Sequence, residues 1–176
     1  MPTSRDSDEM GNMEASFISD RVKQALASKT PLAIHGGNTK AFYGGAIAGE
    51  PLDVRAYAGI IEYEPKELVL TVRAGTPLVD IEAAMEGASQ MLPFEPPHYA
   101  QGSTIGGTVA SGLSGPRRPY TGAVRDFVLG ARIINGNGDD LRFGGRVIKN
   151  VAGYDVSRLM TGAMGTLGVL LDLSFK

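Results

Sequence analysis

The sequence predicts an α+β fold in which strands and helices alternate first and hairpins follow. Three observations lead to this prediction. An amphipathic helix pattern at 17–28 is followed by a short strand pattern at 31–35. Strand patterns around 52–73 then precede a second helix pattern. An Asn-Gly-Asn-Gly run at 135–138 separates two further strand patterns. With 176 residues, we expect two lobes that divide near Thr76 rather than one doubly wound sheet. The expected lobes are residues 17–75 and 76–176.

The N-terminal segment, residues 1–16, is polar and lacks the apolar region of a secretory signal. We predict that it is a disordered tail. The helix at 17–28 follows, with one apolar face made by Ile18, Val22, Ala25 and Leu26. The segment PLAIH, 31–35, reads as a buried strand, and GGNTK, 36–40, reads as a tight loop.

The segments GIIEY and LVLTVR predict two strands joined by a turn at EPKE. The next helix is expected to begin with Thr76 as its N-cap and Pro77 at its first position. Apolar residues at helical spacing continue it, and Gly87 is the expected end. These apolar residues are Leu78, Ile81 and Met85.

The stretch LPFEPPHY, 92–99, is too rich in proline for regular structure. It leads into a glycine-rich segment, 102–122, which contains too much glycine for an ordinary helix or strand. This segment is also too apolar for a flexible linker. Its apolar residues include Ile105, Val109, Ala110 and Leu113.

The C-terminal third predicts a hairpin, a helix and a closing strand. Strands are expected at 127–134 (FVLGARII) and 140–143 (DLRF), with the glycine turn between them. A helix is expected at 154–160 (YDVSRLM) and a strand at 168–175 (GVLLDLSF).

Composition excludes several classes of function. There are 17 Lys+Arg against 19 Asp+Glu, so nucleic acid is not an expected partner. The chain has no cysteine, which excludes disulfides, thiol catalysis and cysteine-based zinc sites. His35 and His98 are its only imidazoles, so no metal site is expected. No apolar run approaches the ~20 residues of a membrane span. We expect a cytoplasmic protein.

Glycine makes up 24 of the 176 residues, about twice its usual share. Three stretches stand out: HGGNTK (35–40), GSTIGG (102–107) and GAMGTLG (162–168). A turn without Cβ atoms can point successive amide groups at one anionic oxygen, above all a phosphate. Taken singly, each stretch is more typical of an ordinary turn than of a binding loop. The spacing matches neither a Rossmann dinucleotide motif nor a P-loop. The apolar segment 102–122 would suit a flat ring lying along it.

Most of the chain resembles one known family. The segments PLAIHGGNTK, ELVLTVRAGTPLVDIEAAM, LPFEPP and STIGGTVASGLSGPRRPYTGAVRDFVLGARIINGNGD are similar to the PCMH-type FAD-binding domain, also called the vanillyl-alcohol oxidase type. The segments GLSGPRRPYTGAVRD and FGGRVIKNVAGYDVSRL resemble, more narrowly, the FAD-binding small subunits of bacterial glycolate oxidases. The resemblance covers residues 17–176.

The resemblance implies two α+β lobes with FAD between them. The residues that it implies around the pyrophosphate are Gly36, Gly37, Asn38, Thr39 and Lys40. Those that it implies along the pyrophosphate and the isoalloxazine are Ser103, Thr104, Gly106, Gly107, Ala110, Ser111 and Gly115. It adds further cofactor contacts at Gly122, Val124, Gly168 and Val169. Some members attach FAD through a histidine just after the paired glycines, where this chain has Asn38. We therefore expect non-covalent FAD.

The resemblance also implies a function. We expect hydride transfer from glycolate or a similar small 2-hydroxy acid to FAD, in a subunit of an oxidase complex that is cytoplasmic or peripheral to the inner membrane. Family members continue into a cap domain that closes over the flavin, and this chain ends where that domain should begin. The alternatives are a non-catalytic FAD-binding or electron-relay subunit, and a fragment without activity of its own. A phosphate-binding module without flavin fits less well, because both glycine regions match.

No catalytic residue is identified from the sequence. Cations near the flavin would favour its reduced anion, although ion pairing at the surface is the more common role. The candidate cations are Arg117, Arg118, Arg125, Lys149 and Arg158. Asp126 and Asp155 are candidate bases or helix caps, Tyr120 and Tyr154 are candidate pocket residues, and His98 is a candidate near the flavin edge.

Overall fold

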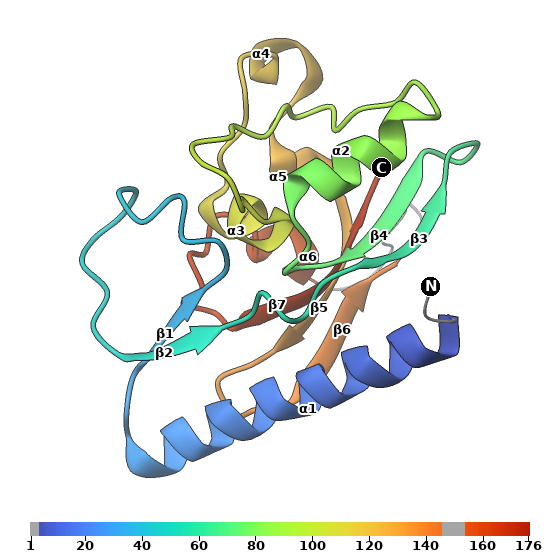
Figure 1. The fold of residues 1–176 in the computed structure, drawn as a ribbon. Helices are drawn as coiled ribbons and strands as arrows, with labels where there is room; N and C mark the ends of the chain where they lie inside the picture. The colour runs from blue at the N-terminus through green and yellow to red at the C-terminus, as the bar shows by residue number, and fades with distance from the viewer. Residues whose placement is uncertain (1–3, 146–153) are drawn as a thin grey trace.

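The computed structural model describes residues 4–145 and 154–176 (Figure 1). A five-stranded sheet forms its centre. A long helix, α1 (Ser4–Ser28), crosses one face of this sheet, and the shorter helices α2 (Leu78–Glu86) and α3 (Ile105–Ser111) lie over the other face. A separate pair of short strands, β1 (Leu32–His35) and β2 (Glu50–Asp53), lies at one edge.

The five-stranded sheet has the order β3-β4-β7-β5-β6, and every neighbouring pair is antiparallel. Its central strand is therefore the one that comes last in sequence. The structure confirms the strands that the sequence predicts here, with ends that shift by one residue or two. They are β3 (Ile60–Glu64), β4 (Val69–Arg73), β5 (Val128–Ile134), β6 (Asp140–Gly144) and β7 (Val169–Phe175).

Strands from both sides of the boundary expected near Thr76 belong to this sheet. Strand β4 lies before that boundary and β7 after it, yet Leu70 is paired with Phe175 and Val72 with Leu173. Local patterns predict that a strand exists but not which partner it takes. Both halves of the chain consequently contribute to one sheet.

The prediction of a disordered tail over residues 1–16 is wrong from Ser4 onward, because α1 has 25 residues. Small side chains extend its buried face toward the N-terminus: Gly11 and Ala15 are buried, as are Ile18, Val22 and Ala25. A Cβ atom at Gly11 would lie 2.8 Å from the Arg73 guanidinium, so glycine lets the helix lie against the sheet. Leu26, predicted on the buried face, is 57% exposed.

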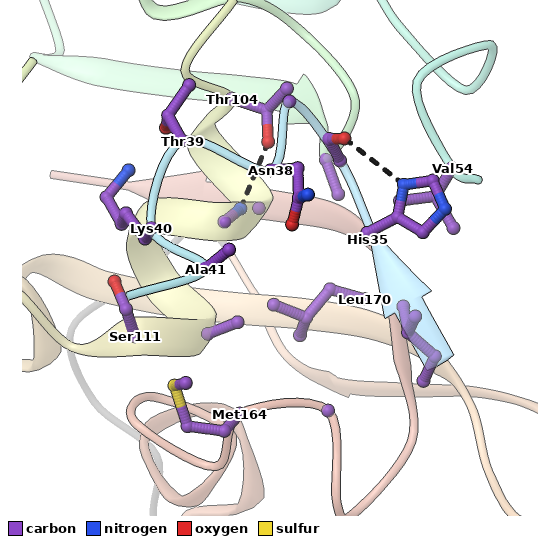
Figure 2. A pocket seen from close by; sticks show the side chains of 18 of the residues that line it. His35, Asn38, Thr39, Lys40, Ala41, Val54, Thr104, Ser111, Met164 and Leu170 are labelled. Carbon is purple, nitrogen blue, oxygen red and sulfur yellow. Dashed lines mark hydrogen bonds between the residues drawn. The ribbon is translucent and has the colours of Figure 1, made fainter. Parts of the chain in front are cut away.

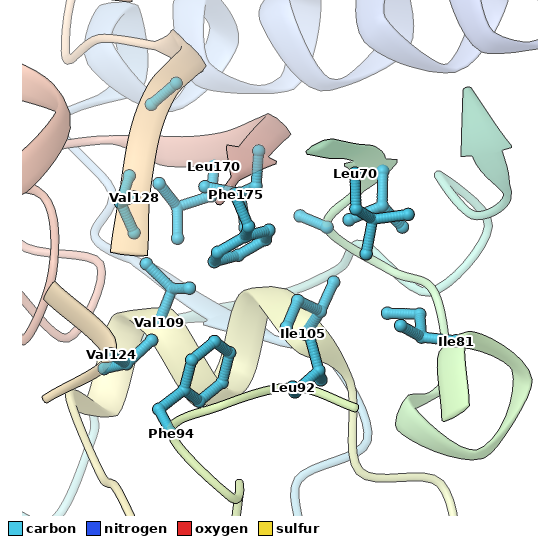
Figure 3. Packing of buried hydrophobic residues seen from close by; sticks show 14 of the residues in the cluster. Leu70, Ile81, Leu92, Phe94, Ile105, Val109, Val124, Val128, Leu170 and Phe175 are labelled. Carbon is cyan, nitrogen blue, oxygen red and sulfur yellow. The ribbon is translucent and has the colours of Figure 1, made fainter. Parts of the chain in front are cut away.

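Hydrophobic side chains cover both faces of the sheet. Beneath α1, Ile18 and Val22 pack with Leu52, Tyr57 and Leu171. The larger cluster on the other face joins the sheet to α2, α3 and α5 (Val124–Phe127), as Figure 3 shows. Its members include Leu70, Ile81, Phe94, Ile105, Val109, Val124, Leu170 and Phe175. The two hydrophobic cores thus lie on opposite faces of one sheet.

The predicted helix after Thr76 is confirmed, and Gly87 is its C-cap, but Thr76 is not its N-cap. The Thr76 hydroxyl instead donates to the Arg73 carbonyl at 2.7 Å and accepts from the Gly59 amide at 2.8 Å. Pro77 occupies the N-cap position without a side-chain bond. The Thr76 hydroxyl is bonded to these two backbone groups and therefore does not cap the helix.

The expectation that residues 102–122 contain no ordinary helix is also wrong. Residues Ile105–Ser111 form α3, whose N-cap Thr104 accepts a hydrogen bond from the Gly107 amide. Gly112 ends the helix in the left-handed conformation, with φ 67°. Glycine within α3 is tolerated because Ile105 and Val109 are fully buried and fix the helix against the sheet. Tertiary packing therefore outweighs the low helix propensity.

The remaining predictions differ only in length. The 135–138 turn is confirmed: the Asn135 side chain accepts hydrogen bonds from the Asn137 and Asp139 amides, and Gly138 has φ 81°. The helix expected at 154–160 is the short α6 (Val156–Leu159), capped by Asp155. Two further short helices, α4 (Arg118–Thr121) and α5, and strand β2 were not predicted. Within the described residues, no helix combines the length and the apolarity needed to cross a bilayer.

The assignment of α1 to the fold can be tested by two neighbouring substitutions. Ile18→Ala should lower the free energy of unfolding by about 2–5 kcal/mol, because it leaves a cavity under the helix. Phe17→Ala, at a side chain that is 54% exposed, should lower it by less than about 1 kcal/mol. Urea unfolding of both variants measures the difference. Equal losses would show that the helix faces the sheet in another register.

Candidate functional site

An open cavity lies where the loop after β1, helix α3 and the start of β7 meet (Figure 2). Its empty volume, including space open to solvent, is about 880 Å³. Most of the predicted cofactor residues line it, although they come from three distant parts of the chain. They are Gly36, Gly37, Asn38, Thr39, Lys40, Thr104, Gly106, Gly107, Ala110, Ser111, Gly168 and Val169.

The first loop (residues 36–40) lies directly against the glycine-rich segment 102–122. A Cβ atom at Gly37 would overlap the Gly102 carbonyl oxygen, and one at Gly36 would lie 2.6 Å from the Thr104 hydroxyl. The Thr39 and Ser103 hydroxyls are hydrogen-bonded at 2.8 Å. The first loop needs its paired glycines to approach the second segment this closely.

The amide groups of the first loop are not used by the fold. Residues 36–40 donate no backbone hydrogen bond to the part of the chain that the structure describes. Asn38 has φ 54°, which turns the backbone through the left-handed conformation. Successive free amides around such a turn form a concave donor set of the kind that binds anionic oxygen.

The amides at the start of α3 are used differently. The Ile105 amide donates to the Thr76 carbonyl at 3.0 Å, and the Gly106 amide donates to the Ala74 carbonyl at 2.8 Å. The Gly107 amide donates to the Thr104 hydroxyl at 3.2 Å (Figure 2). These donors are satisfied within the protein, so a ligand would have to displace existing hydrogen bonds to reach them.

One face of α3 forms a wall of the cavity. Its residues there are Gly107, Ala110 and Ser111, whose side chains are absent or small. The Ser111 hydroxyl donates to the Thr108 carbonyl at 3.1 Å and so lies against the helix. The wall is consequently smooth enough for a planar group to lie along it.

Apolar side chains form the deeper part of the cavity, and one cation lines it. Ile34, Val54 and Leu170 line the apolar part. Burial lowers the pKa of the Lys40 ammonium from its ordinary value, because desolvation disfavours the charged form. An anion bound beside Lys40 would reverse this effect.

Four predicted residues lie outside the cavity lining. Ser103 stands behind Thr39 and acts through that hydroxyl. The Gly115 amide donates to the Phe94 carbonyl at 2.8 Å, and its Cα is close to Glu95. Gly122 ends α4 with φ 104°, and Val124 is fully buried in the larger core. The contacts that the structure shows for these four residues are contacts within the protein.

None of the described candidates for catalysis lines the cavity. Arg117 pairs with Glu95, and Arg158 with Asp155, while Arg118 and Arg125 are exposed. Asp126 and Asp155 accept hydrogen bonds from backbone amides of their own short helices. His98 is bound to Glu82 at 2.8 Å, and Tyr120 and Tyr154 are more than 90% exposed. Lys149 lies outside the described residues.

Several residues of the lining were missed by sequence reasoning. Met164 and Gly165 belong to the third glycine-rich stretch, 162–168, so the glycine pattern had already marked the segment that contains them. Tyr43 and Ile47 lie on the segment after the first loop, which has no secondary-structure pattern. Among the described residues, no group of three or more His, Cys, Asp or Glu could hold a metal ion.

Comparison with known proteins identifies the family of this chain. The model of a family described as an FAD binding domain matches residues 14–144. The chain belongs to this family. FAD is therefore its cofactor, and the predicted resemblance is confirmed.

Three of its relatives illustrate the similarity. Glycolate oxidase subunit GlcE of Escherichia coli is 62% identical over 157 residues, which is 89% of this chain and 45% of the relative. Glycolate oxidase subunit GlcD of Bacillus subtilis is 37% identical over 66% of this chain and 25% of its own length. The D-2-hydroxyglutarate dehydrogenase of Xanthomonas citri pv. viticola is 30% identical over 88% of this chain and 33% of its length. The chain thus spans less than half the length of these relatives.

The close approach of the two loops can be tested with matched glycine substitutions. Gly37→Ala should lower the free energy of unfolding by at least about 1–3 kcal/mol, because its methyl group overlaps a backbone carbonyl. Gly45→Ala should change it by less than about 0.5 kcal/mol, because a Cβ atom there meets nothing within 4 Å. Chemical denaturation of both variants compares them. Tolerance of Gly37→Ala would contradict the described contact.

Proposed function

We propose that this chain is the FAD-binding part of a 2-hydroxy-acid oxidase or dehydrogenase of the glycolate oxidase type, with FAD held non-covalently between two lobes. When bound, the flavin would accept a hydride from a small 2-hydroxy acid such as glycolate. Other subunits would complete the complex and accept the electrons. We propose a cytoplasmic location, either free or peripheral to the inner membrane through that complex.

The observation that carries the proposal is the set of free amides in the first loop. A flavin dinucleotide has a pyrophosphate in its middle, and a concave run of backbone donors suits its oxygens. Gly36 and Gly37 let the loop lie directly against Gly102 and Thr104, and Lys40 adds a positive charge to the cavity lining. The donor set and the charge therefore fit the group.

The second segment would have another role. Because the first amides of α3 are already bonded to the chain, we assign this helix to shape rather than to hydrogen bonding with phosphate. Gly107, Ala110 and Ser111 would lie along the dinucleotide, and the close packing of Gly106 on Ala74 holds the helix in place. Gly168 and Val169 would close the opposite side.

Non-covalent binding follows from the side chains of the first loop. Asn38 has no nucleophilic atom for a flavin bond, and the chain has no cysteine. His35 lines the cavity, but it precedes the glycines and its Nδ1 lies 3.5 Å from the Gly36 carbonyl. The protein would hold the cofactor by hydrogen bonds, charge and packing alone.

One observation favours the alternative of a non-catalytic FAD-binding or electron-relay subunit. The described lining of the cavity contains no carboxylate, and its only titratable side chains are those of His35, Lys40 and Tyr43. A base for a hydroxy acid would then have to come from elsewhere. The residues of this chain would bind and orient the flavin and exclude water from its pyrophosphate.

A visible absorption spectrum tests the proposal directly. The purified chain is incubated with excess FAD and desalted. Retained flavin absorption is expected, and denaturation should release all of it into the supernatant. A folded chain that retains no flavin would contradict the proposal. Bleaching of the retained flavin by glycolate alone would favour catalysis by this chain, whereas reduction by dithionite only would favour the relay alternative.

Substitution of Lys40 tests the charge in the cavity. Lys40→Met should weaken FAD binding roughly 10- to 100-fold, the effect expected when a hydrogen bond to a charged group is lost. Without FAD the variant should be no less stable, because burial disfavours the Lys40 charge. Fluorescence titration with FAD measures the affinity, and Lys66→Met, at an exposed turn, is the control. Equal affinities would exclude Lys40 from the site.

A further inference from the structure

Two exposed aromatic rings meet beside the cavity. The rings of Phe42 and Tyr99 lie with their centroids 4.9 Å apart and their planes at 72°, in an edge-to-face arrangement. Phe42 follows the first loop, and Tyr99 precedes the segment 102–122. The side chains are 66% and 50% exposed, so neither belongs to a hydrophobic core. Their contact contributes to the position of these two segments more than to the stability of the fold.

The chain beyond Phe42 is exposed and weakly held. Residues 41–49, AFYGGAIAG, carry no charge and are all exposed. Residues 44–48 make no hydrogen bond with the part of the chain that the structure describes. Gly44 has φ 109°, and a side chain at Gly45 would meet only open space. This segment is fixed at its far end by β2. At its near end it is fixed by the aromatic contact and by the Ala41 and Tyr43 amides, which donate to the Asn38 and Lys40 carbonyls at 3.3 and 2.9 Å.

The same segment forms one side of the cavity, because Ala41, Tyr43 and Ile47 line it. Its near end is joined to the segment before α3 in successive contacts: Gly37 against Gly102, Thr39 with Ser103, and Phe42 with Tyr99. The aromatic pair is the outermost of these and the only one made by half-exposed side chains. Release of this pair would free residues 44–48 to move, while the inner contacts and the hydrogen bonds of the Ala41 and Tyr43 amides stay in place.

We propose that Phe42 and Tyr99 are positioning residues that hold residues 41–49 against bound FAD and slow its escape. This inference rests on the proposed function, since it requires a dinucleotide in the cavity. A cofactor without a covalent bond is retained only as long as its exit stays closed. An apolar, uncharged segment excludes water from a bound dinucleotide more effectively than a charged one.

The test is the rate at which the 176-residue chain, loaded with FAD, releases its flavin when it is diluted into an excess of a different apoprotein that binds free FAD tightly and so traps it. Phe42→Leu and Tyr99→Leu should each speed release about 2- to 10-fold, the range that an edge-to-face aromatic pair supports. The double variant should release no faster than the faster single variant, because both remove one contact. Tyr99→Phe keeps the ring and should match the unaltered chain.

Phe17→Leu is the matched control, since Phe17 is a similarly exposed phenylalanine on α1, across the sheet from the cavity. Its release rate should not change. Thermal unfolding without FAD should be alike for all variants. If the unaltered chain retains no FAD, both the proposed function and this inference fail. If it retains FAD but the aromatic variants release it at the same rate, or only in proportion to a loss of stability, this inference alone fails.

Discussion

The approach of the Gly37 backbone to the Gly102 carbonyl is the constraint on which the cavity depends. It brings the end of a strand from the N-terminal third against the start of a helix from the middle of the chain. The Thr39–Ser103 hydrogen bond can form only at this separation. The amides of this loop donate no hydrogen bond to the described residues and so stay available. A side chain at either glycine would collide with Gly102 or Thr104 and force the loop away from the second segment.

Within the site, hydrogen bonding and shape come from different elements. The first loop has unused amides and a turn at Asn38, whereas the first amides of α3 are bonded to Ala74, Thr76 and Thr104. A loop whose donors are unsatisfied is costly unless solvent or a ligand reaches it. A helix whose donors are satisfied can pack firmly and act as a wall. Both are rich in glycine, so composition alone does not separate the two roles.

The sequence predicted most strands and most of the cavity lining, because strand patterns and paired glycines are local signals. It did not predict the pairing of β4 with β7, since a strand carries no local mark of its distant partner. It did not predict the first turns of α1, because Gly11 and Ala15 lie on the buried face there. Such small residues do not form a recognisable hydrophobic pattern. The sequence did not predict that Gly115 lies close to Glu95 or that Val124 belongs to the larger core. A glycine pattern indicates that another group lies close to the backbone, but not whether that group is a ligand or another part of the protein.

The central place of β7 has a consequence for the order of folding. Until residues 169–175 pair with both neighbours, β3 and β4 form only a two-stranded hairpin, which is marginal in water. Such long-range pairing is slow, and the unpaired intermediate exposes strand edges and apolar side chains that favour aggregation. Gly168, Val169 and Leu170 also line the cavity, so the sheet and the ligand site are completed in one event. A ligand of this cavity would therefore bind only the finished fold and would stabilise it by mass action.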